Sequence, residues 1–98
     1  MKTILAIDKL ERASKMLKSM AHPVRMSIIE RIKVYGPQTV TELQDALNIE
    51  QAVVSQHLSV MRNNNVLIVE REGKNCIYAL KFEHIKDILS CIERCTDC

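Results

Sequence analysis

The chain has 98 residues, the size of one small domain, and a formal net charge of +2. With 47% apolar and 27% charged residues, it is too hydrophobic for intrinsic disorder. The apolar run at the start is too short for a signal peptide, and no stretch approaches the roughly 18 apolar residues of a membrane span. We therefore expect residues 1–98 to fold as a single cytoplasmic domain with no membrane contact.

Apolar spacing predicts two helices in the first third of the chain. Residues 7–20 carry the stripe of an amphipathic helix at Ile7, Leu10, Ala13, Leu17 and Met20. Pro23 suits the first turn of a second helix, where its missing N–H is not needed. That second helix should end before the Gly-Pro pair at 36–37.

Two shorter helices follow. Thr41 and Gln44 fit a capping box, which predicts a helix from Thr41 to about Asn48. A second helix is predicted over 50–63, because its apolar residues at 54, 58 and 61 share one face. Two short helices joined by about three residues are typical of a helix-turn-helix.

The last third of the chain predicts a β-hairpin and a final helix. Strands over 66–72 and 76–80 flank a turn at 73–75, and residues 82–95 carry apolar side chains at helical spacing. The expected fold class is thus mainly α with a small β-hairpin, a winged helix-turn-helix with the order α-α-α-α-β-β-α.

Four segments resemble the ArsR/SmtB family of winged-helix repressors, and together they span most of the chain. They are Leu17–Arg25, Val54–Arg62, Val69–Lys74 and Tyr78–Leu80. The resemblance implies a homodimer packed through the first and last helices. It also implies a recognition helix in the major groove of double-stranded DNA and a wing that reaches the flanking backbone.

The predicted recognition helix supplies most of the candidate DNA contacts. Gln51 and Gln56 are the best candidates for base contacts, because an amide offers a donor and an acceptor together. The other polar candidates more plausibly hold phosphates, which set register but not sequence. They are Thr41, Ser55 and Arg62, with Lys74 in the wing.

Each of these assignments has an alternative. The polar face at Gln51, Ser55 and Gln56 could simply be solvated, and His57 is either a phosphate contact or a partly buried histidine. The wing residues Arg71, Lys74 and Asn75 either bind phosphate or form an ordinary hairpin tip, since glutamates flank them. Glu50 stands where the family often has Ser, which puts the helix cap and a local phosphate contact in doubt.

Repressors of this family commonly respond to metals or to thiol oxidation. The paired cysteines that many relatives carry in the first helix of the helix-turn-helix are absent from residues 41–47. In the last helix, His84, Cys91, Cys95 and Cys98 form one stripe if the helix continues to its end. His84 and Cys95 are roughly 16 Å apart along that axis, so one ion could join them only across two antiparallel copies.

The resemblance supports such an intersubunit site for Zn²⁺ or another thiophilic ion, because relatives use the positions that match His84, Cys95 and Cys98. Phe82 stands where those relatives have a carboxylate ligand. Cys91 would lie near the twofold axis and could form a disulfide with its mate. Equally, the terminal cysteines could have no function, and Cys76 is most often a buried small hydrophobe.

The sequence predicts a homodimeric DNA-binding repressor, released from its operator by a metal or a thiol-directed effector. Its dimer would recognise a pseudo-palindrome with half-sites one helical turn apart. The alternative is a winged-helix protein-interaction module with weak or no DNA binding, which the small net charge favours. An enzyme is not expected, because there is no glycine-rich phosphate loop and the three histidines lie in separate segments.

Overall fold

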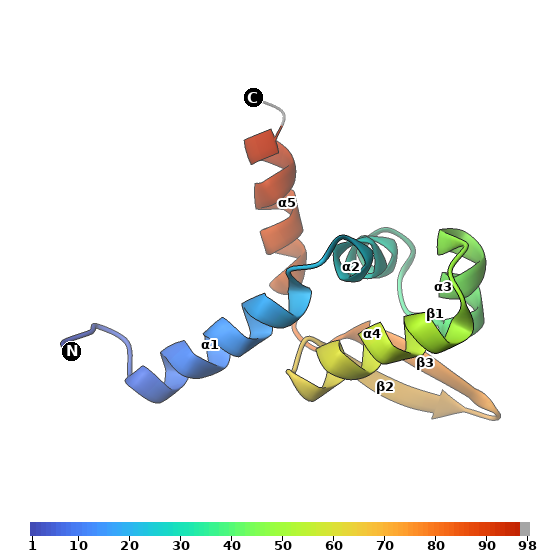
Figure 1. The fold of residues 1–98 in the computed structure, drawn as a ribbon, viewed down its shortest axis with the longest axis horizontal. Coiled ribbons are helices and arrows are strands. Elements are labelled where there is room, and N and C mark those ends of the chain that lie inside the picture. The colour runs from blue at the N-terminus through green and yellow to red at the C-terminus, as the bar shows by residue number, and fades with distance from the viewer. Residues whose placement is uncertain (97–98) are drawn as a thin grey trace.

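The computed structural model describes residues 1–96, and their elements follow the predicted order with one additional short strand between the second and third helices (Figure 1). The helix-turn-helix and the hairpin lie on one side of the molecule, and the two terminal helices project from the other. The helices are α1 (Ile7–Met20), α2 (Pro23–Tyr35), α3 (Val40–Leu47), α4 (Gln51–Asn63) and α5 (Ile85–Thr96), and the strands are β1 (Gln38–Thr39), β2 (Leu67–Glu72) and β3 (Asn75–Leu80).

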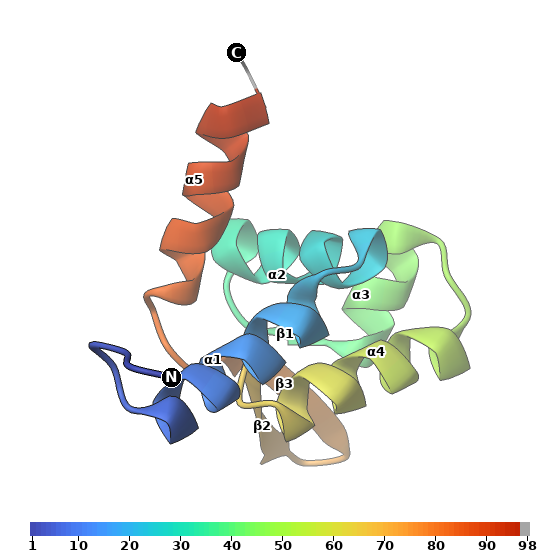
Figure 2. The same cartoon turned by 60° about the vertical axis from the view of Figure 1, so that its left-hand side comes forward.

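Helix α2 lies at the centre of the fold. It packs against α1, α3, α4, α5, β1 and β3, and Figure 2 shows it between α5 and α4. Its Ile28 and Ile29 are fully buried. Burial of such side chains stabilises a fold by about 1.5–3 kcal/mol each. The core cluster comprises Met20, Ile28, Ile29, Ile32, Leu43, Val54, Leu58, Met61, Val66, Leu67, Leu80 and Ile85.

The three strands form an antiparallel sheet in the order β1-β3-β2. The predicted hairpin is confirmed, with strand boundaries moved by one residue. Glu72 pairs with Asn75, so the turn holds only Gly73 and Lys74, and Gly73 has the positive φ of 63° that a type II′ turn needs at its first central position. Strand β1 was not predicted, because two residues are too few to show a periodic pattern.

The predicted capping box at Thr41 and Gln44 is wrong, and the box lies two residues earlier. The Thr39 hydroxyl accepts a hydrogen bond from the Glu42 N–H at 3.1 Å, and the Glu42 carboxylate accepts one from the Thr39 N–H at 3.0 Å. Both pairs of residues fit the capping-box pattern. Pairing between Thr39 and Ile77 in the sheet decides between them, because it holds the chain extended up to Thr39.

The Thr39→Ala variant should therefore lower the free energy of unfolding by about 1 kcal/mol, because it removes the side-chain cap of α3. Thr41→Ala is the matched control. Thr41 is exposed and makes no cap bond, so its removal should change stability by less than about 0.5 kcal/mol. Urea unfolding of both variants measures this, and an equal or larger loss in Thr41→Ala would contradict the assignment.

Helix α5 begins at Ile85, three residues later than predicted. The N–H groups of Ile85, Lys86 and Asp87 each bond to the carbonyl three residues back, so the preceding segment is a tight turn that leads into the helix. None of the helices within residues 1–96 is both long and apolar enough to cross a membrane.

The terminal helices leave apolar side chains uncovered. The predicted stripe of α1 is buried only at Met20, whereas Ile7 is 41% and Leu17 52% exposed. On α5, Ile85 is buried but Ile92 is 38% exposed. Both helices therefore present apolar surface that this subunit does not cover.

Candidate nucleic-acid interface

Helix α4 has one buried face and one polar face. Val54, Leu58 and Met61 are fully buried, as the sequence predicted, and they fix the rotation of the helix about its axis. The opposite face is polar apart from Ala52 and Val53. Its exposed members are Gln51, Ala52, Val53, Gln56, Ser59, Arg62 and Asn63, and Ser55 is half-buried.

The helix-turn-helix begins with α3, whose C-cap Asn48 adopts the left-handed conformation that allows the chain to turn sharply. Glu50 is the N-cap of α4, and its side chain makes no capping hydrogen bond. The doubt that the sequence raised about this cap is therefore justified. Thr41 is exposed in the first turn of α3.

The hairpin lies beside α4, since β2 packs against that helix (Figures 1 and 2). Arg71, Lys74 and Asn75 are all exposed near its tip. Glu70 and Glu72 are exposed as well, so the cations do not form a purely basic wing. The tip therefore has no net charge, and the exposed Arg71 and Lys74 side chains are the cations that could donate to a phosphate backbone.

His57 is half-buried and points toward α2. Its Nδ1 accepts a hydrogen bond of 3.0 Å from Nε of Arg25, and a second guanidinium nitrogen of Arg25 donates to the Ser19 carbonyl at 3.2 Å. The rings of His57 and His22 have centroids 4.7 Å apart. His22 in turn caps α2 by accepting from the Val24 N–H at 3.1 Å.

This cluster joins the start of α2 to the middle of α4, and the sequence did not predict it. Arg25 and His57 are 32 residues apart, so no local spacing could indicate the contact. Two of the histidines that lie in separate sequence segments are neighbours in the fold. Arg25 gives His57 a role in positioning α4 through Nδ1, and the Nε2–H of the ring remains as the donor for the phosphate contact that the sequence predicted.

Burial lowers the pKa of His57 below its ordinary value of 6.5, with smaller contributions from the charges of His22 and Arg25. Protonation therefore costs more in the folded chain than in the unfolded chain. The free energy of unfolding should be fully retained above pH 6.5 and should fall as the pH drops below it, because the unfolded chain takes up the proton first.

His57→Gln should flatten the pH dependence of stability between pH 7 and about 5, because glutamine keeps an acceptor for Arg25 but does not titrate. Ser59→Ala, an exposed change on the same helix, should keep the wild-type pH dependence. Urea unfolding across this pH range measures both. If wild type and His57→Gln have identical pH profiles, His57 is not responsible for the pH dependence of the free energy of unfolding.

The candidate sensor residues lie on or next to α5. Cys91 and Cys95 are exposed, and Cys76 is half-buried in β3. His84 is exposed in the turn before the helix, 4.0 Å from the Asp87 carboxylate. Cys98 lies outside the described residues. Within residues 1–96, no three metal-ligating side chains lie close enough together to hold an ion.

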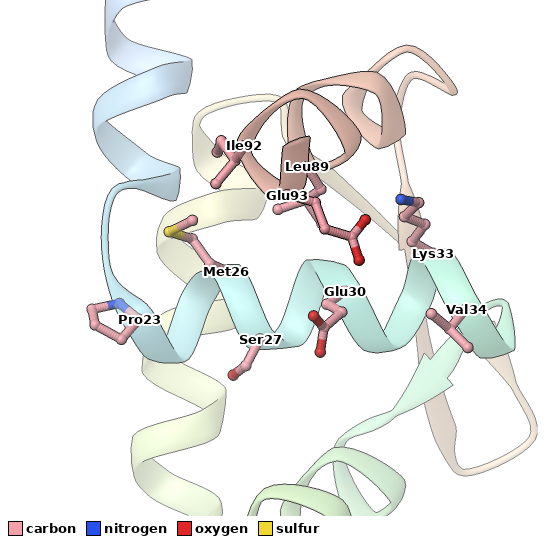
Figure 3. Close-up of a pocket in the computed structure, with 9 residues that line it drawn as sticks. All are labelled: Pro23, Met26, Ser27, Glu30, Lys33, Val34, Leu89, Ile92 and Glu93. Carbon is pink, nitrogen blue, oxygen red and sulfur yellow. The ribbon is translucent and has the colours of Figure 1, made fainter. Parts of the chain in front are cut away.

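A groove of about 540 Å³ is lined by residues of α2 and α5, which pack against each other (Figure 3). Met26 and Val34 of α2 and Leu89 and Ile92 of α5 contribute apolar side chains to its walls. At one end, the Lys33 ammonium donates to the Ser90 hydroxyl at 2.8 Å and ties the two helices together. The groove adjoins the exposed apolar surface of α5, because Ile92 belongs to both.

Taken together, the buried and polar faces of α4, its short connection to α3 and the adjacent hairpin define a winged helix-turn-helix of the transcription-regulator class. A family model described as "Helix-turn-helix domain" matches residues 20–70. The transcriptional repressor PagR of Bacillus anthracis is 34% identical over 80 residues, which cover 82% of this chain and 80% of PagR. The chain belongs to the ArsR/SmtB family of transcriptional regulators, a family of regulators and not of enzymes.

Other comparisons agree on the fold. The crystal structure of PagR superimposes with a TM-score of 0.82 at 31% identity, over 89% of this chain and 99% of PagR. A homodimeric winged helix-turn-helix domain from Mycobacterium bovis has a TM-score of 0.83 at 17% identity, over 98% and 91% of the two chains, which shows a shared fold alone. The repressor SmtB of Mycobacterium tuberculosis is 35% identical over 82% of this chain, and the chain spans 58% of the length of SmtB.

Proposed function

We propose that this protein binds duplex DNA in a sequence-specific manner, as a homodimer, and represses transcription. The observation that carries the proposal is the outer face of α4. Its polar side chains are held outward by three fully buried residues on the opposite face, and a helix with such a face fits the major groove.

Two kinds of contact are proposed. Gln51 and Gln56 would bind base edges, whereas the remaining polar and cationic candidates would hold phosphates and set the register of the complex. His57 would keep α4 joined to Arg25 through Nδ1 and would leave its Nε2–H for a phosphate. The proposed phosphate contacts are Thr41, Ser55, Arg62, Arg71, Lys74 and Asn75.

The homodimer is proposed to form through α1 and α5. The exposed Ile7, Leu17 and Ile92 and the open groove beside α5 supply the apolar surface that such an interface would cover. A twofold arrangement would present two copies of α4 to the DNA. Their target would be a pseudo-palindrome with half-sites about one helical turn apart.

The DNA-binding proposal is tested with duplexes selected from a random library, by measuring affinity at several salt concentrations. Affinity should fall steeply with salt, and Lys74→Ala should weaken all duplexes alike and reduce the slope of log K against log salt by about 1 per subunit. Lys9→Ala, an exposed change on α1, is the charge-matched control.

Absence of a salt-dependent specific complex would overturn the proposal and favour a winged-helix protein-interaction module instead. If Lys74→Ala and Lys9→Ala have equal effects on affinity, the wing is not part of the DNA interface. The role of α4 is then tested separately, by substitutions in that helix.

Release from DNA is proposed to be controlled at α5, where the thiols of Cys91 and Cys95 are both exposed four residues apart. Zn²⁺ or another thiophilic ion would need His84 of one subunit and Cys95 and Cys98 of the other, because in one chain His84 precedes α5 and Cys95 lies in its last turn. Oxidation would instead join two Cys91 thiols in a disulfide, with two electrons and two protons passing to the oxidant.

Titration of the reduced protein with Zn²⁺ or with diamide should lower DNA affinity about 5- to 150-fold, the usual range of allosteric coupling. If the metal acts, Cys95→Ser should abolish the response to Zn²⁺ and keep the response to diamide. If oxidation acts, Cys91→Ser should abolish both the crosslinked dimer on a non-reducing gel and the response to diamide. Unchanged affinity after both treatments would exclude the α5 thiols as the sensor.

A further inference from the structure

The part of α4 that would face the bases carries side chains suited to A·T pairs and lacks the arginine or lysine that usually reads guanine, whereas its serines can bond to any base pair. Arginine or lysine, the usual partners of guanine O6 and N7, are absent from residues 51–61, and Arg62 lies in the last turn. A glutamine amide matches adenine N6 and N7, and small apolar side chains contact the methyl group of thymine.

Three exposed residues bring these chemistries together. Gln56 lies one helical turn after Ala52 and Val53, so the amide and the two apolar side chains occupy one patch of the outer face. Val53 is 38% exposed although it is apolar and β-branched. Contact with an apolar partner would remove the surface of this valine from water, which is favourable in free energy.

The packing of α4 prevents this patch from turning inward. Val54 and Leu58 are fully buried, so rotating the helix to cover Val53 would expose them. His57 is the neighbour of Gln56, but Arg25 already engages its Nδ1. The buried residues of α4, and not contacts of the patch itself, therefore keep the patch facing outward, where a ligand can reach it.

We propose that the patch of Ala52, Val53 and Gln56 recognises A·T base pairs in each half-site. Gln56 binds one adenine through two hydrogen bonds, and Val53 and Ala52 contact the methyl group of a thymine in the same or the adjacent pair. The inference rests on the DNA-binding function proposed above and specifies the sequence class that this function selects.

The first test selects duplexes from a random library with the full chain and compares variants at residue 56. Wild type should enrich an A·T pair at a fixed position in each half-site. Gln56→Ala should lose about 5- to 150-fold of the discrimination at that position, and Gln56→Arg should shift the preference there to G·C. Enrichment unchanged in both variants would overturn the proposal.

The second test replaces each thymine of a selected duplex by uracil, which removes only the methyl group. Wild type should lose about 4-fold in affinity at the thymine that Val53 contacts, as expected for one buried methyl group. Val53→Ser should show no loss there, whereas Val53→Thr, which keeps a methyl group, and the control Ser59→Ala should retain it. Equal losses in wild type and Val53→Ser would contradict the contact.

DNA binding and the preference for A·T pairs are refuted by different results. If no duplex is bound at any salt concentration, DNA binding and base preference are both refuted. If specific duplexes are bound with G·C pairs at the positions that depend on Gln56, only the preference for A·T is refuted.

Discussion

The rest of the structure depends on the burial of α2 at the centre of the fold. Ile28 and Ile29 are fully enclosed, and α2 touches both helices of the helix-turn-helix, two strands of the sheet and both terminal helices. Because protein cores are close-packed, each of these elements has little freedom to rotate or slide. The direction in which α4 presents its polar face is therefore set by packing at a distance from that face.

A polar link reinforces this arrangement. The hydrogen bond between Arg25 and His57 connects α2 to α4 directly, and the cap formed by His22 holds the start of α2 beside it. Local placement of charge matters more than its total, since the chain carries a net charge of only +2. Affinity for a polyanion would have to come from Arg62, Arg71 and Lys74 at the proposed interface.

Much of the fold could be predicted because its signals are local and periodic. The three apolar residues of α4 and the strand-turn-strand pattern around Gly73 indicated their elements correctly. The start of α3 could not be chosen from sequence, because both Thr39 and Thr41 precede a suitable partner and only pairing with β3 distinguishes them. The contact between Arg25 and His57 also depends on tertiary structure, so the sequence predicted the buried and outer faces of α4 but not the hydrogen bond that ties the helix to α2.

The most direct test of the account is to follow backbone amide NMR shifts of the full chain as a selected duplex is added. The account predicts the largest changes at residues 51–56 of α4 and 71–75 of the hairpin, with small changes along the groove between α2 and α5. Changes confined to α1, α5 and that groove would contradict it, because the polar face of α4 would then not be the surface that meets DNA.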